Sequence, residues 1–145
     1  MLLYKQLELF GDVAARVLDG ATRFRASTAS RSMSLAEPAA PPLAGPDSHL
    51  EQQAREMLLS LGAHNLVPLI RVVWSGRLRT AAGRADYQRN LISLNPLLHQ
   101  QGEAEIDRTL RHELAHLVAH ARRGPRRISP HGPEWRQACR DLGIA

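Results

Sequence analysis

The residues with the clearest chemical potential are His112, Glu113 and His116, which stand in the order His-Glu-Leu-Ala-His. No Gly or Pro interrupts residues 110–121, so this stretch is predicted to be helical. On an α-helix, positions i and i+4 share a face, so both imidazoles can bind one metal ion. Glu113, one position round, can then act as general base on a water molecule. The pattern indicates a zinc site, which needs a third ligand and a place for the substrate.

Two histidines compete for the place of the third ligand, His120 and His131. His120 continues the spacing, but it lies roughly 12 Å along the helix axis from His112, too far for converging bonds of about 2.1 Å. His131 follows a break at residues 123–125 and lies in a Pro- and Gly-rich turn that can fold back onto the metal. We therefore favour His131 as the third ligand. We expect His120 either to contact a ligand without binding the metal or to lie at the helix end, where it interacts favourably with the helix dipole.

The chain divides by composition into three parts: residues 1–25, residues 26–47 and residues 48–145. The first part has the apolar spacing of a helix, weakened by a glycine. The second is rich in Pro, Ala and Ser and is predicted to be a flexible linker. The third is predicted to be the folded domain, opening with a helix that Ser48 caps and Glu51 completes as a capping box.

Within the third part, the patterns predict an α+β fold with a three-stranded, mostly antiparallel sheet. The expected strands are 66–74, 78–85 and 91–94, followed by the helix 103–120 and a short last helix from Gly132. The strand over residues 77–85 contains small side chains that leave room for a substrate chain at a sheet edge. A tight turn would explain the same small residues.

Charge is the second property of the whole chain that bears on function. The net charge is +5 and the pI about 10.6, and Lys5 is the only lysine. Arginine suits phosphate because its planar fork donates two parallel hydrogen bonds. Four arginines between the metal-binding segments are candidate DNA contacts, although a solvated run at a helix end is an equal explanation: Arg122, Arg123, Arg126 and Arg127.

Four separate blocks resemble SprT-like zinc metalloproteases, the family of the eukaryotic protein Spartan: residues 74–85, 90–96, 109–116 and 131–135. The blocks stand in the family's order, and the likeness covers about residues 48–143. This resemblance implies a compact, zincin-like minimal metalloprotease domain with Zn²⁺ at His112, His116 and His131 and Glu113 as the base. It also implies a substrate class, proteins trapped covalently on DNA. Trp135 is expected to pack beneath the metal-binding loop.

One departure from the family pattern concerns cysteine. Many members end in a Cys-rich zinc ribbon, whereas this chain contains only Cys139. One thiol cannot form a four-ligand zinc site or an internal disulfide. We expect the ribbon to be missing, so any DNA contact must come from elsewhere.

Near the N-terminus, residues 6–10 resemble the short motif that binds the bacterial DNA sliding clamp. The candidate clamp contacts are Gln6, Leu7, Leu9 and Phe10. A linker behind such a peptide would let the catalytic domain search around its tether. The alternative is that Leu7 and Phe10 form the buried stripe of a first helix.

These observations predict a zinc-dependent endopeptidase acting on DNA-associated or DNA-crosslinked proteins. A metal-dependent nuclease or other hydrolase is one alternative, and a non-catalytic clamp- or DNA-binding module with structural zinc is another. Glu113 favours catalysis, and a structural site would normally have four protein ligands. Neither a signal peptide nor an apolar window of membrane-spanning length is visible, so we expect a cytoplasmic, nucleoid-associated protein.

Overall fold

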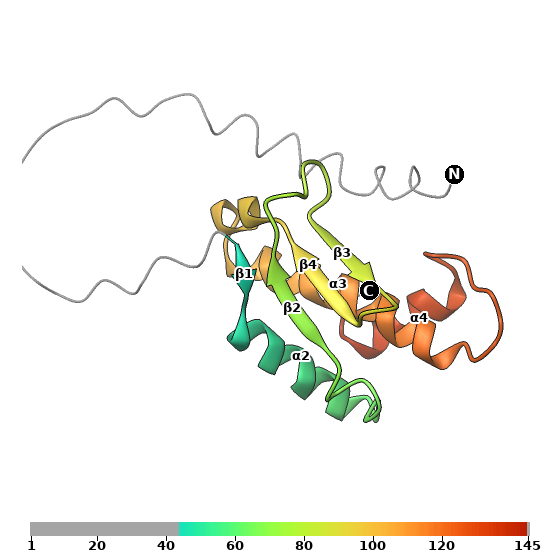
Figure 1. The fold of residues 1–145 in the computed structure, drawn as a ribbon. Helices are drawn as coiled ribbons and strands as arrows, with labels where there is room; N and C mark the ends of the chain where they lie inside the picture. The colour runs from blue at the N-terminus through green and yellow to red at the C-terminus, as the bar shows by residue number, and fades with distance from the viewer. Residues whose placement is uncertain (1–43, 145) are drawn as a thin grey trace, which may run out of the picture.

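The structure, a computed structural model, describes residues 44–144 (Figure 1). Residues 1–25, with the clamp-motif prediction, and most of the predicted linker lie outside this part of the chain. The helices and strands, in chain order, are β1 (Gly45–Pro46), α2 (Ser48–Ser60), β2 (Arg71–Trp74), β3 (Gly83–Asp86), β4 (Leu91–Leu94), the 3-10 helix η1 (Pro96–Gln100), α3 (Glu103–Arg122) and α4 (Pro133–Asp141). The predicted α+β class is confirmed.

The sheet has four strands in the order β1-β2-β4-β3. Its central pair, β2 and β4, is parallel, with Val72 opposite Ile92, whereas β1 and β3 are antiparallel to their neighbours. The prediction of three strands was therefore wrong in number, whereas two of the three strand pairs are antiparallel, in agreement with a mostly antiparallel sheet. After β2 the chain moves to the sheet edge to form β3, and the turn at residues 87–90 returns β4 beside β2 in the same direction. Alternation along a strand does not reveal which neighbour it pairs with.

The start of α2 differs from the predicted capping box. Asp47 is the N-cap, and its carboxylate accepts hydrogen bonds from the backbone N–H groups of His49 and Leu50, each at 3.0 Å. The other oxygen of Asp47 accepts from Trp74 Nε1 at 2.8 Å. Ser48 is the first residue inside the helix. Asp47 thus ties the helix start to β2.

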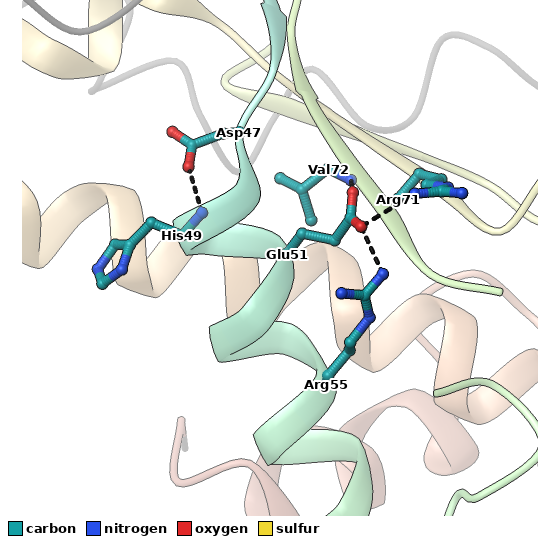
Figure 2. Close-up of polar contacts among 6 residues, drawn as sticks. All are labelled: Asp47, His49, Glu51, Arg55, Arg71 and Val72. Carbon is teal, nitrogen blue, oxygen red and sulfur yellow. Dashed lines mark hydrogen bonds and ion pairs between the residues drawn. The ribbon is translucent and has the colours of Figure 1, made fainter. Parts of the chain in front are cut away.

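Glu51, predicted to reach back to Ser48, instead points across to β2 (Figure 2). This buried carboxylate pairs with Arg55 on the next turn of α2 and with Arg71 at 3.1 Å, and accepts the backbone N–H of Val72 at 3.4 Å. A buried carboxylate needs several such partners to offset its lost hydration. The contacts fasten α2 to the sheet.

Two of the predicted strands are shorter than expected. Residues 61–69 are mostly turns, and the segment before β3 is an irregular loop over residues 75–82. The buried amide of Asn95 donates to the carbonyls of Leu78 and Ala81, at 3.0 and 3.1 Å, and so holds this loop. A side chain after β4 therefore satisfies the loop carbonyls that a longer strand would have paired.

The hydrophobic core lies between the sheet and the helices. In Figure 1, α3 runs behind β4 and β3, and α2 lies beside β2. Completely buried side chains from α2, β2, β4 and α3, and from the residue before β2, meet there: Leu58, Ile70, Val72, Ile92, Leu94, Leu110, Leu114 and Val118. Burying each contributes about 1.5–3 kcal/mol. This core fixes α3, whose observed bounds agree with the predicted helix 103–120.

No helix among the described residues is long and apolar enough to cross a membrane.

Candidate metal centre

Three polar residues on α3 are buried among its apolar ones: Thr109, Glu113 and His116. They face β3 and the loop before α4 rather than solvent. His112 lies one turn before His116, and their ring centroids are 5.2 Å apart. The helix therefore places both imidazoles on one side, as the i, i+4 spacing predicts.

The loop between α3 and α4 brings the third imidazole to the same place. His131 lies with its ring centroid 5.5 Å from that of His112 and 4.9 Å from that of His116. One possible ligand atom from each of the three lies within 4.8 Å of the others. A turn in which the N–H of Gly132 donates to the carbonyl of Ser129 at 3.1 Å sets His131 in position. A Cβ at Gly132 would crowd Ser129 at 3.2 Å, so glycine suits the turn.

His120 lies outside this group, as predicted. Its ring is stacked on Tyr87, with centroids 4.4 Å apart and planes 6° from parallel. Its Nε2 lies 2.8 Å from a guanidinium nitrogen of Arg123 and must accept, because a guanidinium has only donors. Of the two candidates, His131 therefore joins His112 and His116.

The three imidazoles have the chemistry that a divalent transition metal requires. The Nε2 atoms of His116 and His131 are buried and have no hydrogen-bond partner. Burial lowers the pKa of His112 to about 4 and of His116 to about 3, and lowers that of His131, with charge repulsion among the rings adding to the shift of His112 and His116. The rings are thus neutral near pH 7, the form that binds metal. Three nitrogen ligands leave one position of a tetrahedral zinc site open.

Glu113 follows His112 on α3 and is only 1% exposed. Burial raises its pKa to about 8, and a hydrogen bond from the backbone of Ala85 in β3 partly opposes that shift. Its Oε2 is buried without a hydrogen-bond partner. This oxygen is therefore free to form a hydrogen bond with a bound water molecule.

Gly83 belongs to the site, although the sequence indicated only that it is one of several small residues in the strand predicted over residues 77–85. A Cβ at this position would lie 2.8 Å from Cγ of Glu113 and 2.9 Å from Cγ2 of Thr109. Because β3 passes so close to α3, only glycine fits without displacing the carboxylate. A glycine at the start of a strand signals close backbone approach in general, but not which helix residue approaches.

Trp135, on the first turn of α4, supports all three histidines. Its ring centroid lies 4.9 Å from that of His112, 5.5 Å from that of His116 and 4.6 Å from that of His131. The geometry agrees with the expectation that Trp135 packs beneath the metal-binding loop.

The strand predicted to be the substrate edge packs against α3, which carries His112, Glu113 and His116. Substrate binding there stays a prediction. β3 is the outermost strand, paired with β4 on one side and with no strand on its other side among residues 44–144. The strand is shorter than the predicted 77–85 and covers Gly83–Asp86. Its Ala85 contacts Glu113, so a chain paired with this edge would pass the site.

The four candidate DNA-contacting arginines have different surroundings. Arg122 is paired with Asp141 of α4 at 2.6 Å. Arg123 donates to the carbonyl of Arg126 at 2.5 Å as well as contacting His120. The side chains of Arg126 and Arg127 are exposed and have no hydrogen-bond or ion-pair partner within the described part of the chain. DNA contact by this group stays a prediction.

Comparison with known proteins identifies the class to which this fold and site belong. A match to the SprT-like family covers residues 50–145. Protein SprT of Pseudomonas paraeruginosa is 44% identical over 62 residues, which are 42% of this chain and 37% of that protein. Protein SprT of Pectobacterium carotovorum is 52% identical over 56 residues, 38% of this chain and 32% of that protein. Protein SprT of Pseudomonas fluorescens is 43% identical over 77 residues, 52% and 46% of the two chains.

The chain belongs to the SprT-like family. The aligned regions span less than half the length of these relatives. No solved structure matches the chain.

Proposed function

We propose that the chain is a zinc-dependent endopeptidase. One observation supports this most directly: three histidines offer ligand atoms within 4.8 Å of one another, and Glu113, which follows His112 on α3, is buried. Membership of the SprT-like family supports the same class of enzyme. His112, His116 and His131 would bind the metal.

The chemistry divides between metal and protein. Zinc held there would activate a water molecule and polarise the peptide carbonyl. The positive charge of the metal would favour the ionised form of Glu113. Its carboxylate would then accept the proton of the attacking water and deliver it to the leaving amine. Trp135 would hold the three imidazoles in place, and β3 would align the substrate backbone through main-chain hydrogen bonds.

The two rival functions are less well supported by the site. A closed structural zinc site normally has four protein ligands, whereas one group of three histidines is the only such cluster among the described residues. A nuclease would need several cations that face phosphate beside the metal, whereas Arg122 and Arg123 are engaged within the protein and, among the described residues, only Arg127 is a free cation in the pocket beside His116. A buried glutamate with one free oxygen favours peptide hydrolysis.

We further propose that the substrates are proteins bound or crosslinked to DNA, and that residues 6–10 tether the enzyme to the bacterial sliding clamp. The basic pI and the exposed Arg126 and Arg127 support DNA association. The clamp proposal is supported by the sequence of the motif alone.

The metal ligands can be tested by two matched histidine variants. His131→Ala should lose most bound zinc, because it removes one of three nitrogen ligands, whereas His120→Ala should retain one zinc per chain. Zinc content of the purified chains, measured by elemental analysis, decides between them. Zinc loss in the His120 variant alone would reverse the assignment.

Catalysis can be tested with Glu113→Gln. The amide has nearly the same shape but cannot accept a proton, so the variant should fold and bind zinc yet lose at least about 100-fold in peptide cleavage. Cleavage of an unstructured protein substrate, with and without DNA, is the measurement. Turnover near that of the unmodified chain would remove Glu113 as the base.

A further inference from the structure

A pocket of about 210 Å³ adjoins the candidate metal centre on the side of His116. It lies between the end of α3, the residue after β3 and the loop that leads to His131. Its walls include Tyr87, His116, His120, Arg123, Arg127 and Ile128. The volume suits one amino-acid side chain rather than a larger ligand.

The charge of this pocket has one sign. Two arginines line it and no carboxylate does. Arg123 is committed to the protein, because its guanidinium donates to the carbonyl of Arg126 and to His120. Arg127 is exposed and has no hydrogen-bond or ion-pair partner in the described part of the chain. The pocket therefore offers one cation that can bind an incoming group.

The remaining walls are largely apolar. The ring of Tyr87 is held by stacking on His120 at 4.4 Å, and Ala119, Ile128 and Pro130 add aliphatic surface. His120 cannot supply a positive charge while its Nε2 accepts from Arg123. A suitable occupant has a short apolar stem and a negatively charged end.

We propose that this pocket binds an acidic side chain of the substrate, glutamate in preference to aspartate, at a position next to the cleaved bond, with Arg127 binding the carboxylate. The methylene groups of glutamate would pack against Tyr87 and Ile128. The proposal rests on the proposed peptidase function, because it assigns a specificity to the same site. It makes Arg127 a specificity-determining residue rather than only a candidate DNA contact.

The test is a cleavage profile of the full-length, zinc-loaded chain on a mixture of synthetic peptides randomised around their centres. The peptides are amidated at the C-terminus so that only side chains carry carboxylates, and DNA is omitted. Mass spectrometry of the products should show glutamate enriched about tenfold over glutamine at one position beside the cut, the effect of a charge-assisted hydrogen bond. No acidic enrichment at any position would overturn the proposal.

Three variants identify the responsible cation. Arg127→Gln should abolish the acidic preference while peptides without acidic residues are still cut, and Arg127→Glu should shift the preference toward lysine and arginine. Arg140→Gln is the matched control, because it removes an equal charge from an exposed position on α4 outside the pocket. An acidic preference that survives Arg127→Gln would also overturn the proposal.

A binding measurement separates failure of this proposal from failure of the peptidase function. The Glu113→Gln chain is immobilised, and the same peptide mixture is passed over it. Retained peptides should be enriched in glutamate, and the enrichment should disappear when Arg127→Gln is added. If the unmodified chain cuts nothing, the peptidase proposal fails, and retention that does not depend on Arg127 would overturn the pocket assignment independently.

Discussion

Glu113 and the neighbouring histidines respond to the same burial in opposite directions. Loss of hydration disfavours the charged form of each, so the pKa of the carboxyl rises while those of His112 and His116 fall. Near pH 7 the metal-free site is therefore close to uncharged. A cluster of buried ionisable groups is tolerable without metal only in this state.

This charge state predicts a pH dependence for the metal-free chain. The pKa of Glu113 is raised from 4.5 to about 8 in the folded protein. Between pH 4.5 and about 8, Glu113 holds a proton in the folded state that it has released in the unfolded state. The contribution of Glu113 to the free energy of unfolding therefore falls as pH rises. Glu113→Gln removes this contribution. We expect the unmodified chain to lose stability relative to the variant from pH 5 to pH 8.

The measurement is chemical denaturation of both chains after chelation of metal. The histidines, whose lowered pKa values make stability fall as pH drops below 6.5, are present in both chains and cancel in the difference. Identical pH profiles for the two chains would contradict the prediction.

At the scale of elements, the site depends on how closely β3 approaches α3. Gly83→Ala places a methyl group 2.8 Å from Cγ of Glu113, so strand or carboxylate must move. We expect a loss of about 1–3 kcal/mol in the free energy of unfolding. Peptide cleavage should fall by a larger factor than zinc binding, because the displaced group is the base and not a ligand.

Gly76→Ala is the control for this variant. Gly76 lies in the loop before β3, and a Cβ there would meet nothing within 4 Å. Its effect on stability should stay within about 0.5 kcal/mol. If Gly83→Ala were as mild as Gly76→Ala in both stability and cleavage, the close approach would have no functional consequence.

The sequence predicted the parts of this domain that rest on local spacing. The i, i+4 spacing predicts that His112 and His116 share one face of a helix. The choice of His131 as third ligand follows because His120 lies too far along the helix axis from His112. Features that depend on distant residues could not be found this way. Three such features join segments far apart in the sequence. Glu51 accepts a hydrogen bond from β2, Asn95 donates to the loop before β3, and β2 pairs in parallel with β4.

For the whole molecule, the proposed tether should be separable from catalysis. Removing residues 1–25 should leave zinc content and peptide cleavage unchanged but abolish binding to the cognate sliding clamp. Leu9→Ala combined with Phe10→Ala in the full chain should have the same effect on clamp binding, because short peptides bind through a few anchoring side chains. Zinc analysis, cleavage and surface plasmon resonance against the clamp are the measurements. Unfolding of the shortened chain would assign these apolar residues to the core instead.

DNA binding should depend on the exposed arginines more than on the paired ones. Arg126→Ser should weaken DNA binding, because the guanidinium of Arg126 is available to phosphate. It should also reduce the slope of log affinity against log salt concentration by about one. Arg122→Ser should do less, since Arg122 is already paired with Asp141. Affinity for duplex DNA at several salt concentrations is the measurement. Equal losses for both variants would indicate a general charge effect.

The open edge of β3 has a consequence for the behaviour of the protein at high concentration. Unpaired backbone groups on an edge strand can pair with any extended chain, including another copy of the same protein. The strand has only four residues, and Arg84 and Asp86 place charges of both signs along it. Short length and charge are the usual means by which soluble proteins prevent edge-to-edge aggregation. An edge that stays open to substrate must therefore resist self-association through its own side chains.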